Sequence, residues 1–93
     1  MTEYRVDWPS LLSDIAYLLG DPHPANRDVR IPCGERSLAT HIGVSRGAVQ
    51  GWYTGSEPKH ADGERLIARW CLLTGKARTF VPTERRTLSA HSR

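Results

Sequence analysis

The sequence ERSLATHIGVSRGAVQGWYT, residues 35–54, has the pattern of two short helices joined by a tight turn. The apolar residues of its first half lie three or four positions apart, so a helix places them on one face: Leu38, Ala39 and Ile42. Gly43 follows where the chain must bend sharply, which is least unfavourable for a residue without a Cβ. The second half has an apolar face of its own, formed by Val49 and Trp52. We expect the two faces to pack against each other.

The residues that follow Gly43 also suit a tight turn between two helices. Val44 follows Gly43 as an apolar plug, and Ser45 can cap the second helix through its hydroxyl. The segment has a small residue in its first helix, a glycine at the turn and an apolar residue, Trp52, late in its second helix. In these features it resembles the helix-turn-helix of the lambda-repressor/Cro-like DNA-binding family. The resemblance covers about a fifth of the chain. It implies a lambda-repressor-like bundle that binds double-stranded DNA.

Two further helices are expected outside this segment. Asp7 can cap a helix that has Pro9 at its first position, and apolar residues then recur at helical spacing until Gly20. A last helix is expected over residues 62–74, with one apolar face made of Leu66, Ile67, Trp70 and Leu73. The sequence therefore predicts an all-α fold, a bundle of four to five helices with the helix-turn-helix at about residues 35–54.

The segments between the helices carry weaker patterns. Residues 2–7 alternate weakly, as a short extended arm would. Residues 21–32 contain three prolines and predict a loop, longer than most helix–helix connections. This loop either packs across the core through Val29 and Ile31 or reaches a partner. Residues 79–81, Thr-Phe-Val, are β-prone, and in Cro-like proteins a C-terminal strand can pair two subunits.

The positive charge of the chain is concentrated near its C-terminus. The net charge is +3, yet residues 1–75 hold eight Lys or Arg against nine Asp or Glu, whereas residues 76–93 hold five against one. We therefore expect a DNA-binding domain over residues 1–75 and a basic, mobile tail over residues 76–93, without an apolar period after Pro82. Such a tail either follows phosphates along a duplex or is a solvated end.

Length and composition limit the remaining possibilities. The 93 residues suit one small domain with a single core. No apolar run approaches the roughly 18 residues of a membrane span, and the polar N-terminus does not look like a signal peptide. Cys33 and Cys71 are widely separated, which favours a reduced, cytoplasmic protein.

The resemblance assigns contact roles to individual residues. The second helix of such a motif lies in the major groove, so the candidates for base contacts are Ser45, Arg46, Gly47, Gln50 and Thr54. Arg46 suits guanine O6 and N7, and Gln50 suits adenine N6 and N7, each good pair discriminating by about 1–3 kcal/mol. The candidates for contacts to the DNA backbone are Arg36, Ser37, Tyr53, Thr54, Lys59 and His60.

Two features depart from the family pattern. Gly47 and Gly51 lie on the outer side of the presumed recognition helix, and neither offers a side chain for reading bases. Each also makes the helix about 1 kcal/mol less stable than Ala would. Glu35 stands where the family often has Gln. A phosphate repels a carboxylate, so we expect Glu35 to pair with a neighbouring Arg or to cap its own helix end.

Little in the sequence supports an enzymatic or a metal-binding function. Residues 43–47 match the G-x-S-x-G nucleophile elbow, but that motif needs a preceding strand and a sheet. Cys33, His41, His60 and Cys71 lack the close ligand spacing of structural zinc sites. We therefore expect no enzyme, no metal, no cofactor and no small-molecule ligand.

The function expected is sequence-specific binding of double-stranded DNA by a small, repressor-like transcriptional regulator of the phage or prophage type. On family grounds such a protein is a homodimer on an inverted repeat with half-sites about 34–36 Å apart. Two alternatives remain open: a protein–protein interaction or adaptor module on the same fold, and a DNA-binding accessory factor in phage packaging or transposition.

Overall fold

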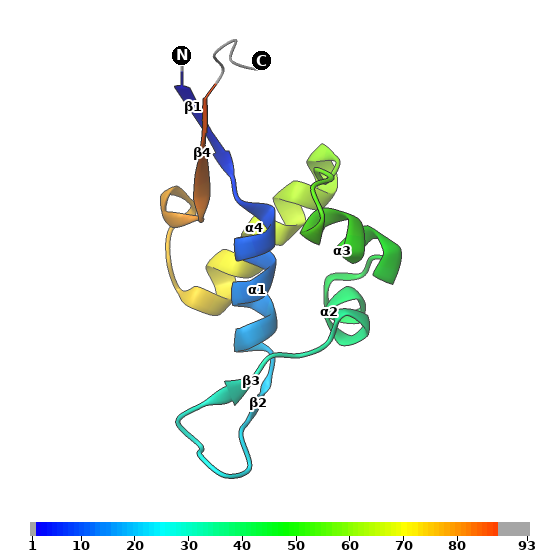
Figure 1. Ribbon diagram of the computed structural model, residues 1–93, viewed down its shortest axis with the longest axis vertical. Helices are drawn as coiled ribbons and strands as arrows, with labels where there is room; N and C mark the ends of the chain where they lie inside the picture. The colour runs from blue at the N-terminus through cyan, green and yellow to red at the C-terminus, as the bar shows by residue number, and fades with distance from the viewer. Residues whose placement is uncertain (1, 88–93) are drawn as a thin grey trace.

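The computed structural model describes residues 2–87 and shows a mostly helical domain (Figure 1). Its four α-helices are α1 (Trp8–Leu18), α2 (Glu35–Ile42), α3 (Arg46–Tyr53) and α4 (His60–Thr74). The described residues also contain two small two-stranded sheets, β1–β4 and β2–β3. The number of helices agrees with the expected four to five, but the all-α expectation is wrong in missing the strands.

Helix α1 is capped by Asp7 as expected, but it begins at Trp8, one residue before the expected first position. The Asp7 carboxylate accepts hydrogen bonds from the Ser10 backbone N–H at 3.2 Å and from the Ser10 hydroxyl at 2.8 Å. Pro9 occupies the second position of the helix, where no backbone donor is needed. At the other end, the Arg30 guanidinium donates to the carbonyls of Leu18 and Gly20, at 3.2 and 2.9 Å. The bond to Leu18 satisfies a carbonyl group that the helix itself leaves without a partner.

The core lies between α1, α4 and the α2–α3 pair. It consists of the apolar faces expected from the sequence, namely Leu11, Leu12, Ile15, Ala16, Leu38, Ala39, Ile42, Val49, Trp52, Leu66, Ile67 and Trp70. The Trp70 indole N–H donates to the Asp14 carboxylate at 2.9 Å and so joins α4 to α1. Trp8 packs on α4 at Gly63, where a Cβ would stand 3.1 Å from the ring. Within residues 2–87, no helix has the length and apolar character needed to cross a membrane.

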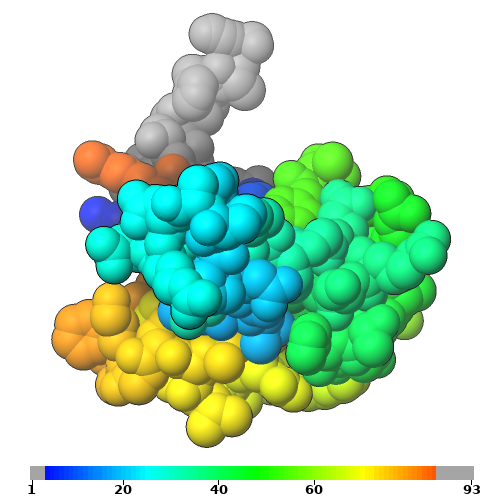
Figure 2. All heavy atoms as spheres, turned by 90° about the horizontal axis from the view of Figure 1, so that it is seen from below, coloured from blue at the N-terminus to red at the C-terminus, as the bar shows by residue number. Residues whose placement is uncertain are grey.

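The segment 21–32 forms a short hairpin in place of the expected loop. Strand β2 (Asp21–Pro22) pairs antiparallel with β3 (Arg30–Ile31), and the hairpin extends away from the helices (Figure 1). Val29 and Ile31 are 45% and 47% exposed, so the first of the two alternatives for this segment, packing across the core, is wrong. Figure 2 shows this hairpin from below, lying over one end of α1.

The two ends of the chain form the second sheet. Strand β1 (Thr2–Val6) pairs antiparallel with β4 (Thr83–Thr87), and the Asp7 N–H continues the ladder with a 2.9 Å bond to the Pro82 carbonyl. The extended arm expected near the N-terminus is therefore confirmed. The β-prone residues 79–81 are not a strand, because a 3-10 turn, η1, covers Arg78–Phe80.

The structure also corrects the expected tail. Residues 83–87 are a regular strand and belong with the domain, not with a segment that lacks structure. The partner that makes them a strand comes from the opposite end of the chain, so no local pattern could indicate it. The remainder of the expected tail, residues 88–93, lies outside the described residues.

Candidate nucleic-acid interface

Helices α2 and α3 are joined by the tight turn that the sequence predicts. Gly43 adopts a left-handed conformation, with φ at +86°, and its N–H donates to the Ala39 carbonyl at 2.8 Å. Ser45 then caps α3, because its hydroxyl oxygen accepts a 3.1 Å bond from the Ala48 N–H. The turn thus ends one helix and begins the next within three residues.

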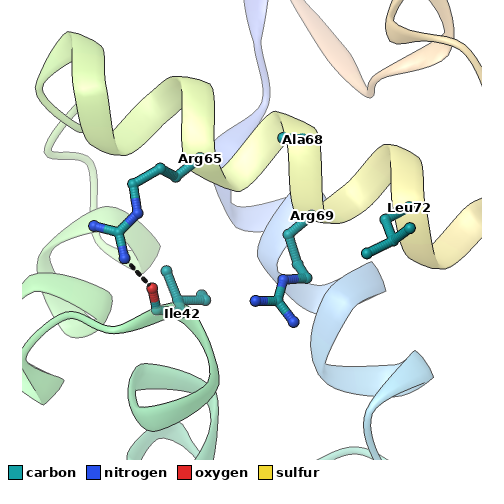
Figure 3. Close-up of a pocket in the computed structure, with 5 residues that line it drawn as sticks. All are labelled: Ile42, Arg65, Ala68, Arg69 and Leu72. Atoms are coloured by element: carbon teal, nitrogen blue, oxygen red, sulfur yellow. Dashed lines mark hydrogen bonds between the residues drawn. The ribbon is translucent and has the colours of Figure 1, made fainter.

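Two arginines of α4 hold the end of α2 in place, and Figure 3 shows the bond made by one of them, Arg65. Arg65 donates to the Ile42 carbonyl, and Arg69 donates to the His41 carbonyl at 3.3 Å. Cations near the C-terminus of a helix also interact favourably with its dipole. Arg65, Arg69 and Leu72 line a pocket at the place where α4 packs against the end of α2.

The outward face of α3 carries the residues assigned to base contacts. All of them are exposed: Ser45, Arg46, Gly47, Gln50 and Thr54. The opposite face is buried through Val49 and Trp52. Because positions four apart lie on one side of a helix, Arg46 and Gln50 are neighbours on the exposed side. The structure therefore brings together the two side chains best suited to base edges.

Glu35 forms a polar cluster with both of these side chains. Its Oε1 accepts a 3.0 Å hydrogen bond from Gln50 Nε2 and lies 3.6 Å from Arg46 Nε. The ion pair is exposed, so it contributes little to stability. The expectation that Glu35 pairs with a neighbouring arginine is confirmed. Its hydrogen bond with Gln50 was not foreseen, because that bond depends on how α2 and α3 pack.

Arg36 and Ser37 lie in the first turn of α2, and both are exposed. The N-cap residue, Gly34, has no side chain with which to cap this helix end. Backbone N–H groups and two polar side chains are thus presented together at the positive end of the helix dipole. This arrangement can receive a phosphate.

The two residues at the end of α3 are more constrained than expected. The Tyr53 ring is half-buried against the core. Burial raises the pKa of its phenol, an effect that a hydrogen bond with Ser13 partly opposes. Thr54 directs its hydroxyl to the carbonyls of Gln50 and Gly51, at 3.0 and 3.2 Å. These interactions hold the side chains within the protein, so they are weaker candidates for DNA contacts than Arg46 or Gln50.

Lys59 and His60 stand at the start of α4, and both are exposed. Nearby, Arg78 forms a bidentate ion pair with Glu64 at 2.7 and 2.6 Å. This pair lowers the pKa of Glu64 and raises the pKa of Arg78. It also joins η1 to α4, so Arg78 acts within the fold although it belongs to the basic segment.

The glycines of α3 differ in their surroundings. A Cβ at Gly47 would approach no atom more closely than the Ser45 hydroxyl, at 4.0 Å. A Cβ at Gly51 would make an ordinary contact with Ser56, at 3.5 Å. Packing inside the domain therefore does not require glycine at either position.

The sequence also raised a metal site and a nucleophilic serine, and the described residues bear on both. Over residues 2–87, no three His, Cys, Asp or Glu side chains gather as a metal site would require. Cys33 and Cys71 are half-buried free thiols, and burial raises the pKa of Cys33. Ser45 follows a helix, whereas the nucleophile elbow needs a strand there.

No protein-family model, curated protein or solved structure matches this chain. The geometry of the α2–α3 unit is therefore the basis for the functional proposal.

Proposed function

We propose that this protein is a sequence-specific double-stranded-DNA-binding protein, a small transcriptional regulator of the lambda-repressor/Cro-like type. In this proposal α2 and α3 are its helix-turn-helix and α3 enters the major groove. The observation that carries the proposal is the exposed face of α3, where Arg46 and Gln50 lie together while the opposite face is buried.

The dimensions of α3 suit the groove. An α-helix with its side chains is about 10–12 Å across, which is close to the width of about 12 Å of the major groove of B-DNA. Arg46 and Gln50 are separated by about 6 Å along the helix, or roughly two base-pair steps of about 3.4 Å each. Two side chains at this spacing can contact bases that are about two steps apart.

The contacts of Glu35 are compatible with base reading. Arg46 approaches the carboxylate with Nε, 3.6 Å from Oε1, and its terminal amino groups suit guanine. Gln50 gives one Nε2 hydrogen to Glu35, so its second hydrogen and its carbonyl oxygen remain for adenine. Glu35 thus supports an orientation in which both side chains keep their reading groups.

The remaining polar residues supply positioning contacts. Most protein–DNA hydrogen bonds go to phosphate and sugar, and such contacts set register without reading sequence. Arg36 and Ser37 provide them at the start of α2. Lys59 and His60 provide them at the start of α4.

Selection from random duplex DNA tests the proposal. The purified protein is mixed with the random pool at physiological salt, and the retained DNA is sequenced. We expect an enriched site, and an inverted repeat would indicate a homodimer. Arg46→Ala should weaken binding to that site by about 5- to 150-fold, the loss of one bidentate contact, and much less to random DNA. Arg36→Ala is the matched control and should weaken binding to both about equally. A retained pool without enrichment contradicts sequence-specific binding.

A protein-interaction or adaptor module is the second candidate function. The open space at Gly47 favours it, because an exposed backbone allows close approach by another protein. DNA affinity of the proposed regulator should fall with salt at a log–log slope of about −0.9 per neutralised phosphate. Absence of this dependence would favour the adaptor. An accessory factor in packaging or transposition would share the DNA interface but not the regulatory outcome.

A further inference from the structure

The β1–β4 ribbon projects from the helical body and has an open edge along β1 (Figure 1). Among residues 2–87, β4 is the strand that pairs with β1, and no other strand lies along its second edge. Near the middle of β1, Tyr4 is 68% exposed. An open strand edge presents unpaired N–H and C=O groups and is a template for pairing with another strand.

The register shows which residues of β1 face this open edge. The bond from the Asp7 N–H to the Pro82 carbonyl makes these two residues a hydrogen-bonded pair. In an antiparallel ladder, hydrogen-bonded and non-hydrogen-bonded pairs alternate. The Tyr4–Arg85 pair is therefore non-hydrogen-bonded. It follows that the backbone groups of Tyr4 point away from β4, toward the open edge.

The sequence of β1 is complementary to itself in the antiparallel direction. When two copies pair with Tyr4 at the centre, Tyr4 faces Tyr4 of the second copy as a hydrogen-bonded pair. Glu3 then stands opposite Arg5 of the second copy, and Thr2 stands opposite Val6. Opposite charges and aromatic pairs at facing positions stabilise a sheet.

The charge pattern extends across the whole ribbon. Within one copy, Glu3 stands opposite Arg86 and Arg5 stands opposite Glu84. Pairing through β1 would therefore add a register position at which Glu3 of one copy stands opposite Arg5 of the second copy. The same operation on the β4 edge also pairs Glu84 with Arg86, but it places Arg85 opposite Arg85 at the centre, a like-charge pair that destabilises a sheet. Charge complementarity thus favours the β1 edge.

We propose that the open edge of β1 binds the same edge of a second copy of this chain. The result is a four-stranded antiparallel sheet with strand order β4-β1-β1-β4 and a two-fold axis at Tyr4. Such an interface uses the same surface on both subunits. The inference does not rest on DNA binding, and the interface forms without DNA.

Proline substitutions at the two ribbon edges test this proposal. The mass of the full chain is measured without DNA by sedimentation equilibrium over a range of subunit concentrations up to about 1 mM. The wild-type chain should reach twice its mass of 10.4 kDa. Tyr4→Pro removes an N–H that points toward the open edge and no bond to β4, so it should give a monomer. Arg85→Pro, at the matching position on β4, should remain a dimer.

A second variant keeps the test decisive if proline disrupts the ribbon. Tyr4→Glu places a carboxylate opposite Arg85 within one copy, which favours the ribbon, but it places two carboxylates opposite each other in the dimer. It should raise the dimer dissociation constant by roughly tenfold and leave the helical circular dichroism unchanged. A wild-type monomer throughout the range overturns the proposal. So does a dimer whose dissociation constant Tyr4→Glu leaves unchanged.

Discussion

Gly43→Ala perturbs the turn on which the α2–α3 unit depends. Gly43 has a φ of +86°, and a Cβ at this position would stand 2.7 Å from Arg65 Nη2. The substitution therefore has two costs. One is the left-handed backbone of a residue with a side chain. The other is displacement of the Arg65 guanidinium from the Ile42 carbonyl.

Each cost can be estimated from its physical origin. A left-handed conformation destabilises a non-glycine residue by about 1–2 kcal/mol. Arg65 can swing away, because its guanidinium ends a flexible side chain, so the second cost is the lost hydrogen bond. Half of this side chain is exposed, and we assign the bond about 1 kcal/mol. The free energy of unfolding should therefore fall by about 2–3 kcal/mol.

Urea unfolding followed by circular dichroism measures this loss. Gly75→Ala is the matched control, because Gly75 also has a positive φ, of +72°, but its Cβ would meet no atom within 4 Å. It should show the backbone cost alone. In an Arg65→Ala background, Gly43→Ala should cost no more than Gly75→Ala does.

The reasoning is refuted if Gly43→Ala and Gly75→Ala destabilise the wild-type protein equally. It is also refuted if the cost of Gly43→Ala is the same with and without Arg65. Either result would mean that the Arg65 contact at the turn contributes nothing to the stability of the protein.

Three further predictions follow from individual contacts. Glu35→Gln should raise affinity for random duplex DNA by up to about fivefold at low salt, because a like charge about 4 Å from a phosphate costs about 1 kcal/mol in water; fluorescence anisotropy that shows weaker binding instead would mean a favourable contact by the carboxylate. Trp70→Phe removes the 2.9 Å bond to Asp14 and should lower the free energy of unfolding by about 1.5–3 kcal/mol, and an unchanged urea midpoint would contradict this. Burial raises the pKa of Tyr53, so its contribution to stability is complete below the unfolded pKa of about 10 and is lost as the pH rises toward the higher folded value. Tyr53→Phe should remove a phenolate absorbance transition above the ordinary tyrosine pKa; a wild-type spectrum without that transition would show the ring to be solvated.

Local patterns predicted the helices because the signals that start and stop a helix lie within a few residues of its ends. Asp7 caps α1, Ser45 caps α3, and Gly75 ends α4 as expected. Helix α4 begins at His60, two residues before the expected start. The exposed position of Arg46 and Gln50 was equally predictable, because the apolar residues of α3 fix which face is buried.

The polar cluster at Glu35 could be predicted only in part. The repulsion between a carboxylate and a phosphate suggested an arginine partner, and Arg46 fills that role. Gln50 joins the cluster because the crossing of α2 over α3 brings its amide to the same oxygen. The arginines that hold the end of α2 come from α4, more than twenty residues away, and no spacing rule connects them.

The sequence by itself determined the helices, the apolar core and the turn at Gly43, because each depends on the period and conformational preference of neighbouring residues. Only the tertiary structure decided the pairing of β1 with β4 and the contacts that hold α2 against α4. The physical reason is the same in both cases. A strand at one end of the chain is stabilised by hydrogen bonds from the other end, and a helix carbonyl is satisfied by whichever donor the packing of the core delivers to it.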